Sequence, residues 1–145
     1  MSKRVLVTSS QGWDDYLFIH KVLKALWILA PDAVLVSGAC PRGGDALCER
    51  AWHRLGGEVE RHRIELWSRY GRAAGMRRSE HMVSLGADIC VAFILPCLRP
   101  ECRLAKPSRG LGFHGTHGSV HCADYAEDHG IAVRRFAPIP AAWAT

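Results

Sequence analysis

The sequence has no long hydrophobic runs and no repeats. No apolar segment approaches the ~20 residues that are needed to span a bilayer, and residues 1–7 run directly into an apolar β-type stretch without the hydrophobic core of a signal peptide. Internal repeats and low-complexity tracts are also missing. We therefore expect a cytoplasmic protein with no membrane partner.

Charge of one sign is not concentrated in any segment. The chain has 19 Lys and Arg against 14 Asp and Glu, a formal net charge of +5. The 19 basic residues divide into 11 in residues 1–72 and 8 in residues 73–145, so no basic arm stands out. This balance suits a small anionic ligand at least as well as it suits nucleic acid, which we regard as the less favoured partner.

Length and cysteine content predict one domain, residues 1–145. At 145 residues and 48% hydrophobic composition, the chain can bury a core without help from metals or disulfides. Six cysteines in a chain without an export signal favour reduced thiols or a metal site over a disulfide framework. The sequence leaves homo-oligomer formation open.

The hydrophobic pattern predicts alternating strands and helices. Apolar or alternating runs indicate five strands, at Arg4–Thr8, Ala33–Val36, Glu58–Ile64, Asp88–Leu95 and Ile131–Phe136. The charged third run fits a sheet edge, and the fourth, the most apolar, fits the interior. Helical spacing fills the intervals, apart from a polar loop that begins at Leu66 and leads into a short helix closing at Gly86, and a Cys/His-containing excursion at residues 96–118. The fold class is therefore α/β, a Rossmann-like three-layer sandwich with a mostly parallel five-stranded sheet and helices on both faces.

The segment VLVSGACPRGGD, Val34–Asp45, is an apolar strand followed by a glycine-rich turn and the start of a helix. Such a turn lets the backbone approach an anion, which the N–H groups of the helix then bind. The candidate ligand residues here are Gly38, Arg42, Gly43, Gly44 and Asp45. The alternative is a tight turn in which Asp45 caps the helix and nothing binds, because neither the Walker nor the GxGxxG spacing is present.

Two further loops are expected at the same edge of the sheet. Thr8–Trp13 and Gly115–Ser119 follow the first strand and precede the last helix, and ligands of open α/β sheets bind at the carboxyl ends of strands. Ser119, at the end of the second of these loops, is therefore also a candidate ligand residue. The arginine-rich segment Leu66–Gly86 adds Arg72 and Arg78, unless its charges form only a solvated face.

Four segments in this order resemble the cpYpsA-related branch of the SLOG superfamily: VTSSQGW, SGACPRGGD, YGRAAGMRRSEHM and GTHGS. The resemblance implies a Rossmann-like domain that binds a nucleotide or nucleotide-derived ligand, as in a superfamily that includes the LOG phosphoribohydrolases and the DNA-binding DprA proteins. It also implies ligand roles for the residues at matching motif positions, which are Ser9, Trp13, Gly38, Arg42, Gly43, Asp45, Arg78, Gly115 and Thr116.

The chain departs from the SLOG pattern in three segments. Ser10-Gln11 replaces a glycine-serine-arginine turn of many relatives, and Ser79 stands where the family usually has asparagine. The glutamate that follows the GT loop in LOG enzymes is replaced by His117-Gly118-Ser119, so Glu80 or Asp45 would have to act as the acid. Glu80 is the candidate catalytic residue, and the resemblance supports binding better than hydrolysis.

Cysteines and histidines are concentrated in and beside the excursion. Six of them fall within 26 residues: Cys97, Cys102, His114, His117, His121 and Cys122. Cys97, Cys102 and Cys122 with His117 are candidate ligands of a structural zinc ion, which would supply folding energy to a segment without a core. The alternative is unpaired thiols and surface histidines, or histidines that contact a ligand phosphate.

The function expected from these features is the binding or sensing of a nucleotide-derived phosphate ligand, similar to ADP-ribose or a nucleoside phosphate. The amides of Gly43, Gly44, Gly115 and Thr116 would receive the phosphate, with Arg42 and Arg78 as cationic clamps. One alternative is a LOG-like nucleoside 5'-monophosphate N-glycosidase. Another is DprA-like binding of single-stranded nucleic acid, for which few aromatic side chains remain outside the helix stripes.

Overall fold

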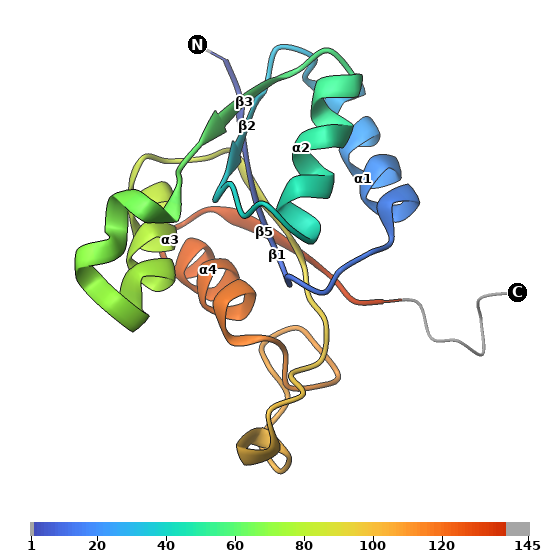
Figure 1. Ribbon diagram of the computed structural model, residues 1–145. Helices are drawn as coiled ribbons and strands as arrows, with labels where there is room; N and C mark the ends of the chain where they lie inside the picture. Colours follow the sequence, from blue (N-terminus) through green and yellow to red (C-terminus); the bar gives the residue numbers. More distant parts are fainter. Residues whose placement is uncertain (1, 139–145) are drawn as a thin grey trace, which may run out of the picture.

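The chain folds into a five-stranded sheet with helices on both faces (Figure 1), in a computed structural model that describes residues 2–138. The strands are β1 (Arg4–Ser9), β2 (Val34–Ser37), β3 (Glu58–Arg61), β4 (Ile89–Phe93) and β5 (Ala132–Phe136). The helices are α1 (Tyr16–Leu29), α2 (Gly44–Arg54), α3 (Ala74–Ser84) and α4 (His117–Asp128), with 3-10 segments η1 (Ile64–Ala73) and η2 (Pro100–Cys102). The C-terminal segment PIPAAWAT, which the sequence indicates is irregular, lies outside the described residues apart from Pro138.

The strand order is β3-β2-β1-β4-β5, and every neighbouring pair is parallel. β1 is the central strand, in which Val5 pairs with Leu35 on one side and with Ile89 on the other. β3 lies at an edge and β4 in the interior, as their composition predicted. The Rossmann-like α/β architecture expected from the sequence is confirmed.

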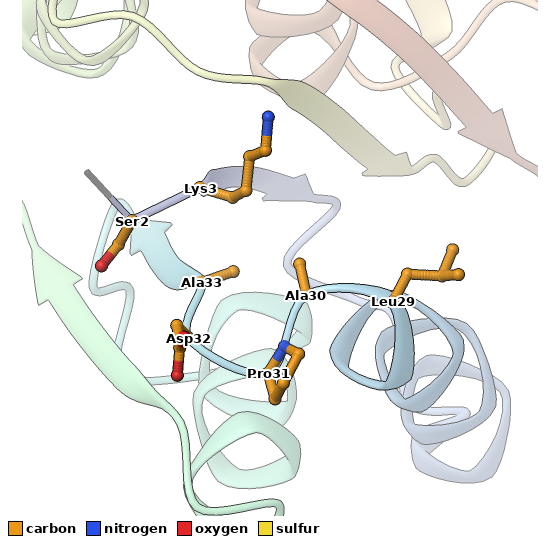
Figure 2. Close-up of a pocket in the computed structure, with 7 residues that line it drawn as sticks. All are labelled: Ser2, Lys3, Leu29, Ala30, Pro31, Asp32 and Ala33. Carbon is orange, nitrogen blue, oxygen red and sulfur yellow. The ribbon is translucent and has the colours of Figure 1, made fainter.

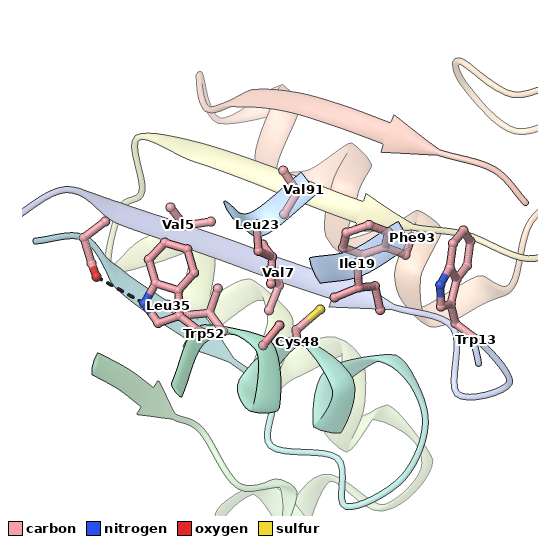
Figure 3. Packing of buried hydrophobic residues seen from close by; sticks show 12 residues of the cluster. Val5, Val7, Trp13, Ile19, Leu23, Leu35, Cys48, Trp52, Val91 and Phe93 are labelled. Atoms are coloured by element: carbon pink, nitrogen blue, oxygen red, sulfur yellow. Dashed lines mark hydrogen bonds between the residues drawn. The ribbon is translucent and has the colours of Figure 1, made fainter. Parts of the chain in front are cut away.

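Alternation along β1 divides the core between the two faces of the sheet. Val5 and Val7 face α1 and α2, where they pack with Leu23 and Trp52 (Figure 3). The Trp52 indole N–H donates to the Ala33 carbonyl oxygen at 3.3 Å. On the opposite face, Leu6 packs with buried residues of α3 and α4, which include Met82, Val83, Cys122 and Ala126. The sheet is therefore covered on both sides by apolar helix stripes.

The largest difference from the predicted elements follows β3. The strand ends at Arg61 rather than Ile64, and the 3-10 turns of η1, Ile64–Ala73, occupy the start of the expected polar loop. Gly71 interrupts these turns with φ 56, a left-handed conformation that glycine adopts without steric cost. Within residues 2–138, no helix is long and apolar enough to cross a membrane.

Removal of the Glu60 charge should destabilise the fold modestly. Arg4 donates to both carboxylate oxygens of Glu60, at 2.9 and 2.8 Å, across the intervening strand β2. These bonds lower the pKa of Glu60 to about 2, so the stabilisation is present above the unfolded pKa near 4.5 and is lost as pH falls toward 2. Because the pair is partly exposed, we expect Glu60→Gln to cost only about 1 kcal/mol in urea unfolding at neutral pH.

The control for this substitution is Glu58→Gln, which changes an exposed carboxylate on the same strand. It should alter the free energy of unfolding by less than about 0.5 kcal/mol. Equal effects of the two substitutions would contradict a specific role of the Arg4–Glu60 pair.

Candidate functional site

Three loops meet at the carboxyl edge of the sheet, beside the point where the strand order reverses. From β1 the chain proceeds through β2 to β3 on one side, and β4 and β5 lie on the other. The crevice at such a switch point is the usual ligand site of open α/β sheets. Ser9 lies against Gly44, and the Ser10 hydroxyl is 2.6 Å from the Thr116 hydroxyl. The loop after β1 therefore touches the N-termini of both α2 and α4.

The N-terminus of α2 is built by close backbone contacts that require glycine. Gly43 has φ 75, and a Cβ atom there would overlap the Gln11 carbonyl group. A Cβ atom on Gly44 would overlap the Ser9 hydroxyl. Ala39, in the same loop, adopts a left-handed φ of 57, which is strained for a residue with a Cβ atom. The loop between β2 and α2 therefore contains a strained backbone conformation at Ala39, and its glycines let it pack directly against the loop after β1.

The first turn of α2 has no side-chain cap. Its N-cap residue is Gly43, which offers no side-chain acceptor to the N–H groups that begin the helix. Free N–H groups and the positive end of the helix dipole are the two features by which helix N-termini commonly bind anions. Arg42, which precedes the cap, is exposed beside them.

Asp45 and Arg78 place two charged groups next to this helix start. Asp45 is 7% exposed, and its Oδ1 atom has no hydrogen-bond partner. Arg78 donates from Nη1 to the Gly38 carbonyl oxygen at 3.0 Å, whereas its buried Nε has no partner. The guanidinium carbon would be 2.9 Å from a Cβ atom on Gly38, so glycine is needed for Arg78 to lie over the loop.

Burial raises the pKa of Asp45 from 3.8 to about 6. Attraction to Arg78 and a hydrogen bond from the Cys40 backbone oppose this shift, and repulsion from Glu49 adds to it. Loss of hydration is the largest cause because a carboxylate is strongly solvated in water and few protein groups replace that water here.

The N-terminus of α4 is joined to β1 and β4 by hydroxyl groups. The buried Ser10 and Ser119 and the half-buried Thr116 form a cluster in which the Thr116 hydroxyl is 2.6 Å from each of the other two. The Leu95 backbone N–H donates to the Ser10 hydroxyl at 2.8 Å. Gly115 is buried, and a Cβ atom there would press on Ile94 and Val120. Sequence reasoning selected Thr116 and Ser119 but missed Ser10, which the two consecutive serines at the end of the first strand could have indicated.

Several predicted residues lie elsewhere. Trp13 is buried in the core, with its ring centroid 5.4 Å from that of Phe93, so its position does not fit the expected ligand role. Arg72 is exposed on η1. Glu80 is paired through both oxygens, with Arg77 at 3.1 Å and His121 at 3.0 Å.

Four cysteine and histidine residues converge at the base of the excursion. Ligand atoms of Cys97, Cys102, His114 and His117 all lie within 4.8 Å of one another, so the group can hold a metal ion. This corrects the expected ligand set, because Cys122 is buried in the core, where it contacts Cys90, Ser79 and Thr8. His114 takes its place. The pair His114-x2-His117 opposite Cys97-x4-Cys102 was the available sequence signal.

A separate pocket lies at the opposite end of the strands, where β1 and β2 begin. Figure 2 shows it beside the beginning of β1 and the turn between α1 and β2. Its lining is Ser2, Lys3, Leu29, Ala30, Pro31, Asp32 and Ala33. Because these residues precede their strands, the pocket includes none of the three loops described above.

Comparison with known proteins identifies the family of this Rossmann-like domain. The model of the YspA, cpYpsA-related SLOG family matches residues 3–70. The Gene 61 protein of Mycobacterium phage D29 is 32% identical over 143 residues, which cover 95% of this chain and 99% of the phage protein. No solved structure gives a significant match. The chain belongs to the YspA, cpYpsA-related SLOG family, and this membership supports a nucleotide-related binding role.

Asp45→Asn should make stability less dependent on pH. Because the folded-state pKa is raised, the proton-linked stabilisation is complete below about pH 3.8 and is lost as pH rises through about 6. An asparagine cannot ionise and keeps the shape of the side chain. In urea unfolding, the stability of the variant relative to the natural chain should rise by about 2 kcal/mol between about pH 4 and pH 8.

The control for this prediction is Asp32→Asn, which changes an exposed carboxylate in the turn before β2. Its stability difference from the natural chain should change little over the same range. A pH-independent difference for Asp45→Asn would contradict a raised pKa at that position.

Proposed function

We propose that this protein binds a nucleotide-derived phosphate ligand, of the ADP-ribose or nucleoside-phosphate type, at the carboxyl edge of its sheet. The observation that carries the proposal is a pair of charged groups in contact with the glycine-rich loop, the buried Asp45 in the first turn of α2 and the half-buried Arg78 of α3, each with one buried polar atom that lacks a hydrogen-bond partner. Among the described residues, four buried side-chain polar atoms have no hydrogen-bond partner, and Asp45 Oδ1 and Arg78 Nε are two of them.

Buried charges without full compensation cost stability, so their position calls for an explanation. A buried charged group that lacks a partner typically costs several kcal/mol. Proteins keep such groups where a ligand supplies the missing contacts, and perturbed acids in a cleft are enriched at functional sites. The strained φ of Ala39 in the adjoining loop supports the same interpretation.

The chemistry of these groups fits a phosphate ester linked to a sugar. The uncapped N–H groups of α2, the Arg78 guanidinium and the exposed Arg42 are donors for phosphate oxygens. Asp45 is an acceptor, which suits a ribose hydroxyl group better than a second anion. A ligand with both parts uses the donors and the acceptor together.

The α4 side of the edge is less open to a ligand. The side chains of Thr116 and Ser119 already bond to each other and to Ser10. We therefore assign the main phosphate contact to α2. The Gly115 and Thr116 amides, which the sequence led us to expect at the phosphate, already donate to the Ser108 hydroxyl at 2.8 Å and to the Leu95 carbonyl oxygen at 3.1 Å.

Arg78→Ala should weaken ligand binding. Loss of a charged donor at a partly buried phosphate contact costs about 2 kcal/mol, or roughly 30-fold in affinity. Isothermal titration calorimetry with ADP-ribose, AMP and ADP will identify a binding ligand and then compare variants. Arg77→Ala is the matched control, because Arg77 is the exposed neighbour that pairs with Glu80 instead.

The two arginine variants separate binding from stability. Thermal unfolding of Arg78→Ala will show whether loss of its bond to the Gly38 carbonyl affects the fold. An affinity equal to that of the natural chain in a folded Arg78→Ala protein would overturn the assignment. Affinity for single-stranded DNA that falls steeply with salt, and none for the nucleotides, would favour a nucleic-acid module instead.

Turnover tests the hydrolytic alternative. Because Glu80 is bonded to Arg77 and His121, neither of its oxygens is free to protonate a leaving group in this arrangement. We expect nucleoside monophosphates and NAD to be recovered intact after incubation, as measured by chromatography for free base. Base release that Glu80→Gln abolishes would replace the binding proposal with an N-glycosidase.

A further inference from the structure

The geometry points to a structural zinc site formed by Cys97, Cys102, His114 and His117, through which the first turn of α4 is fixed to the excursion. This inference concerns residues outside the nucleotide proposal and does not depend on it. It rests on the positions of four ligand atoms, on the second nitrogen of His114, and on the lack of a core in the excursion.

The separations of the ligand atoms fit one tetrahedral ion. His117 Nε2 is 3.4 Å from Cys102 Sγ, 3.7 Å from Cys97 Sγ and 3.1 Å from His114 Nε2. Zinc with bonds of about 2.0 Å to nitrogen and 2.3 Å to sulfur would place its ligand atoms roughly 3.3 to 3.8 Å apart. A single ion at the centre of the group therefore reaches all four atoms.

The second nitrogen of His114 is already oriented for metal binding. His114 Nδ1 lies 3.2 Å from the Lys106 carbonyl oxygen, to which it can donate only as an N–H group. That hydrogen bond leaves the lone pair of Nε2 directed at the cluster. A backbone carbonyl that orients a ligating histidine is a common feature of zinc sites.

The chemistry of the ligands favours zinc over harder cations. Two thiolates and two imidazoles with tetrahedral spacing suit zinc, whereas magnesium and calcium prefer oxygen ligands. Cys97 and Cys102 are free thiols, and each releases a proton when it binds the ion. Four protein ligands leave no open position, so we assign a structural rather than a catalytic role.

The excursion needs such an ion because it has little core of its own. No residue from 96 to 114 is buried, and Leu98 and Leu104 are 90% and 93% exposed. The two ends of the segment meet through a bridge between Pro96 and Gly115 and a bond from Cys97 N–H to the His114 carbonyl oxygen. Leu111 and Phe113 also pack against Ile94 and Ala123, but none of residues 96–110 joins a hydrophobic cluster, so these contacts offset only part of the entropy lost when the segment is ordered.

The site also reaches the carboxyl edge of the sheet. His117 is the first residue of α4, and Thr116 before it bonds to Ser10 and Ser119. An ion bound to His117 therefore restrains the helix start next to the hydroxyl cluster. At the other end of the helix, Arg109 of the excursion pairs with Glu127 and Asp128, both at 2.8 Å.

The test is metal binding by the full chain in the absence of nucleotide. Elemental analysis of protein dialysed against zinc and then against buffer should give about one zinc per chain. Cobalt(II) in its place should give the visible absorption of a tetrahedral ion and a thiolate charge-transfer band. Zinc content far below one, or a cobalt spectrum of octahedral type, would overturn the site.

Ligand variants test which residues take part. Competition with a chromogenic chelator should show affinity weakened by more than about 100-fold in Cys102→Ser and in His114→Ala. Cys122→Ala and Cys40→Ser should keep the zinc affinity of the natural chain, since neither residue belongs to the cluster. Loss of zinc in Cys122→Ala with retention in His114→Ala would refute this ligand set.

Hydrogen exchange tests the structural role and remains informative if a variant folds poorly. Removal of zinc from the natural chain by a chelator should increase exchange in residues 96–120 and leave β1 protected, because the main core does not include the cluster. Unchanged exchange after the metal has left would show that the ion does not order the excursion.

Discussion

Pairing of β1 on both of its edges is the constraint on which the rest of the structure depends. Ser9 and Ser10 follow one another at the end of this strand, so they direct their hydroxyl groups toward different partners. Ser9 lies against Gly44 at the start of α2, and Ser10 bonds to Thr116 at the start of α4. One strand end therefore sets the positions of both helix N-termini, and a shift in β1 register would separate them from each other.

Asp45 and Arg78 carry charged groups that reduce the stability of the fold but are suited to binding a ligand. Burial raises the pKa of Asp45, and Arg78 offsets that shift only in part. A core designed for stability alone would replace both charges with apolar side chains of similar size. Their retention beside an uncapped helix start fits a site that is incomplete until a ligand supplies donors, acceptors and charge.

Much of the fold was predictable from the sequence because its signals are local. Apolar runs marked β1, β2 and β4, and the charges of Glu58–Arg61 marked an edge strand. The same locality limits what could be predicted of the site. Trp13 and Cys122 occupy positions that motif matching or residue type linked to chemistry, but their burial depends on which helix face meets the sheet. The η1 turns were missed because they lack a regular apolar period.

Metal ligands were only partly predictable for a similar reason. Spacing alone cannot show whether His114 or Cys122 is the fourth ligand, since both lie within a few residues of His117. The position of each residue relative to helix α4 explains which one joins the cluster. Cys122 is five residues after His117 on that helix and faces the sheet, whereas His114 precedes the helix and remains with the excursion. A helix that begins at a proposed metal ligand and ends at carboxylates paired with Arg109 is restrained by the same segment at both ends. That arrangement links an excursion with little core of its own to the edge where the nucleotide site is proposed, because α4 cannot shift without disturbing the Ser10–Thr116 contact.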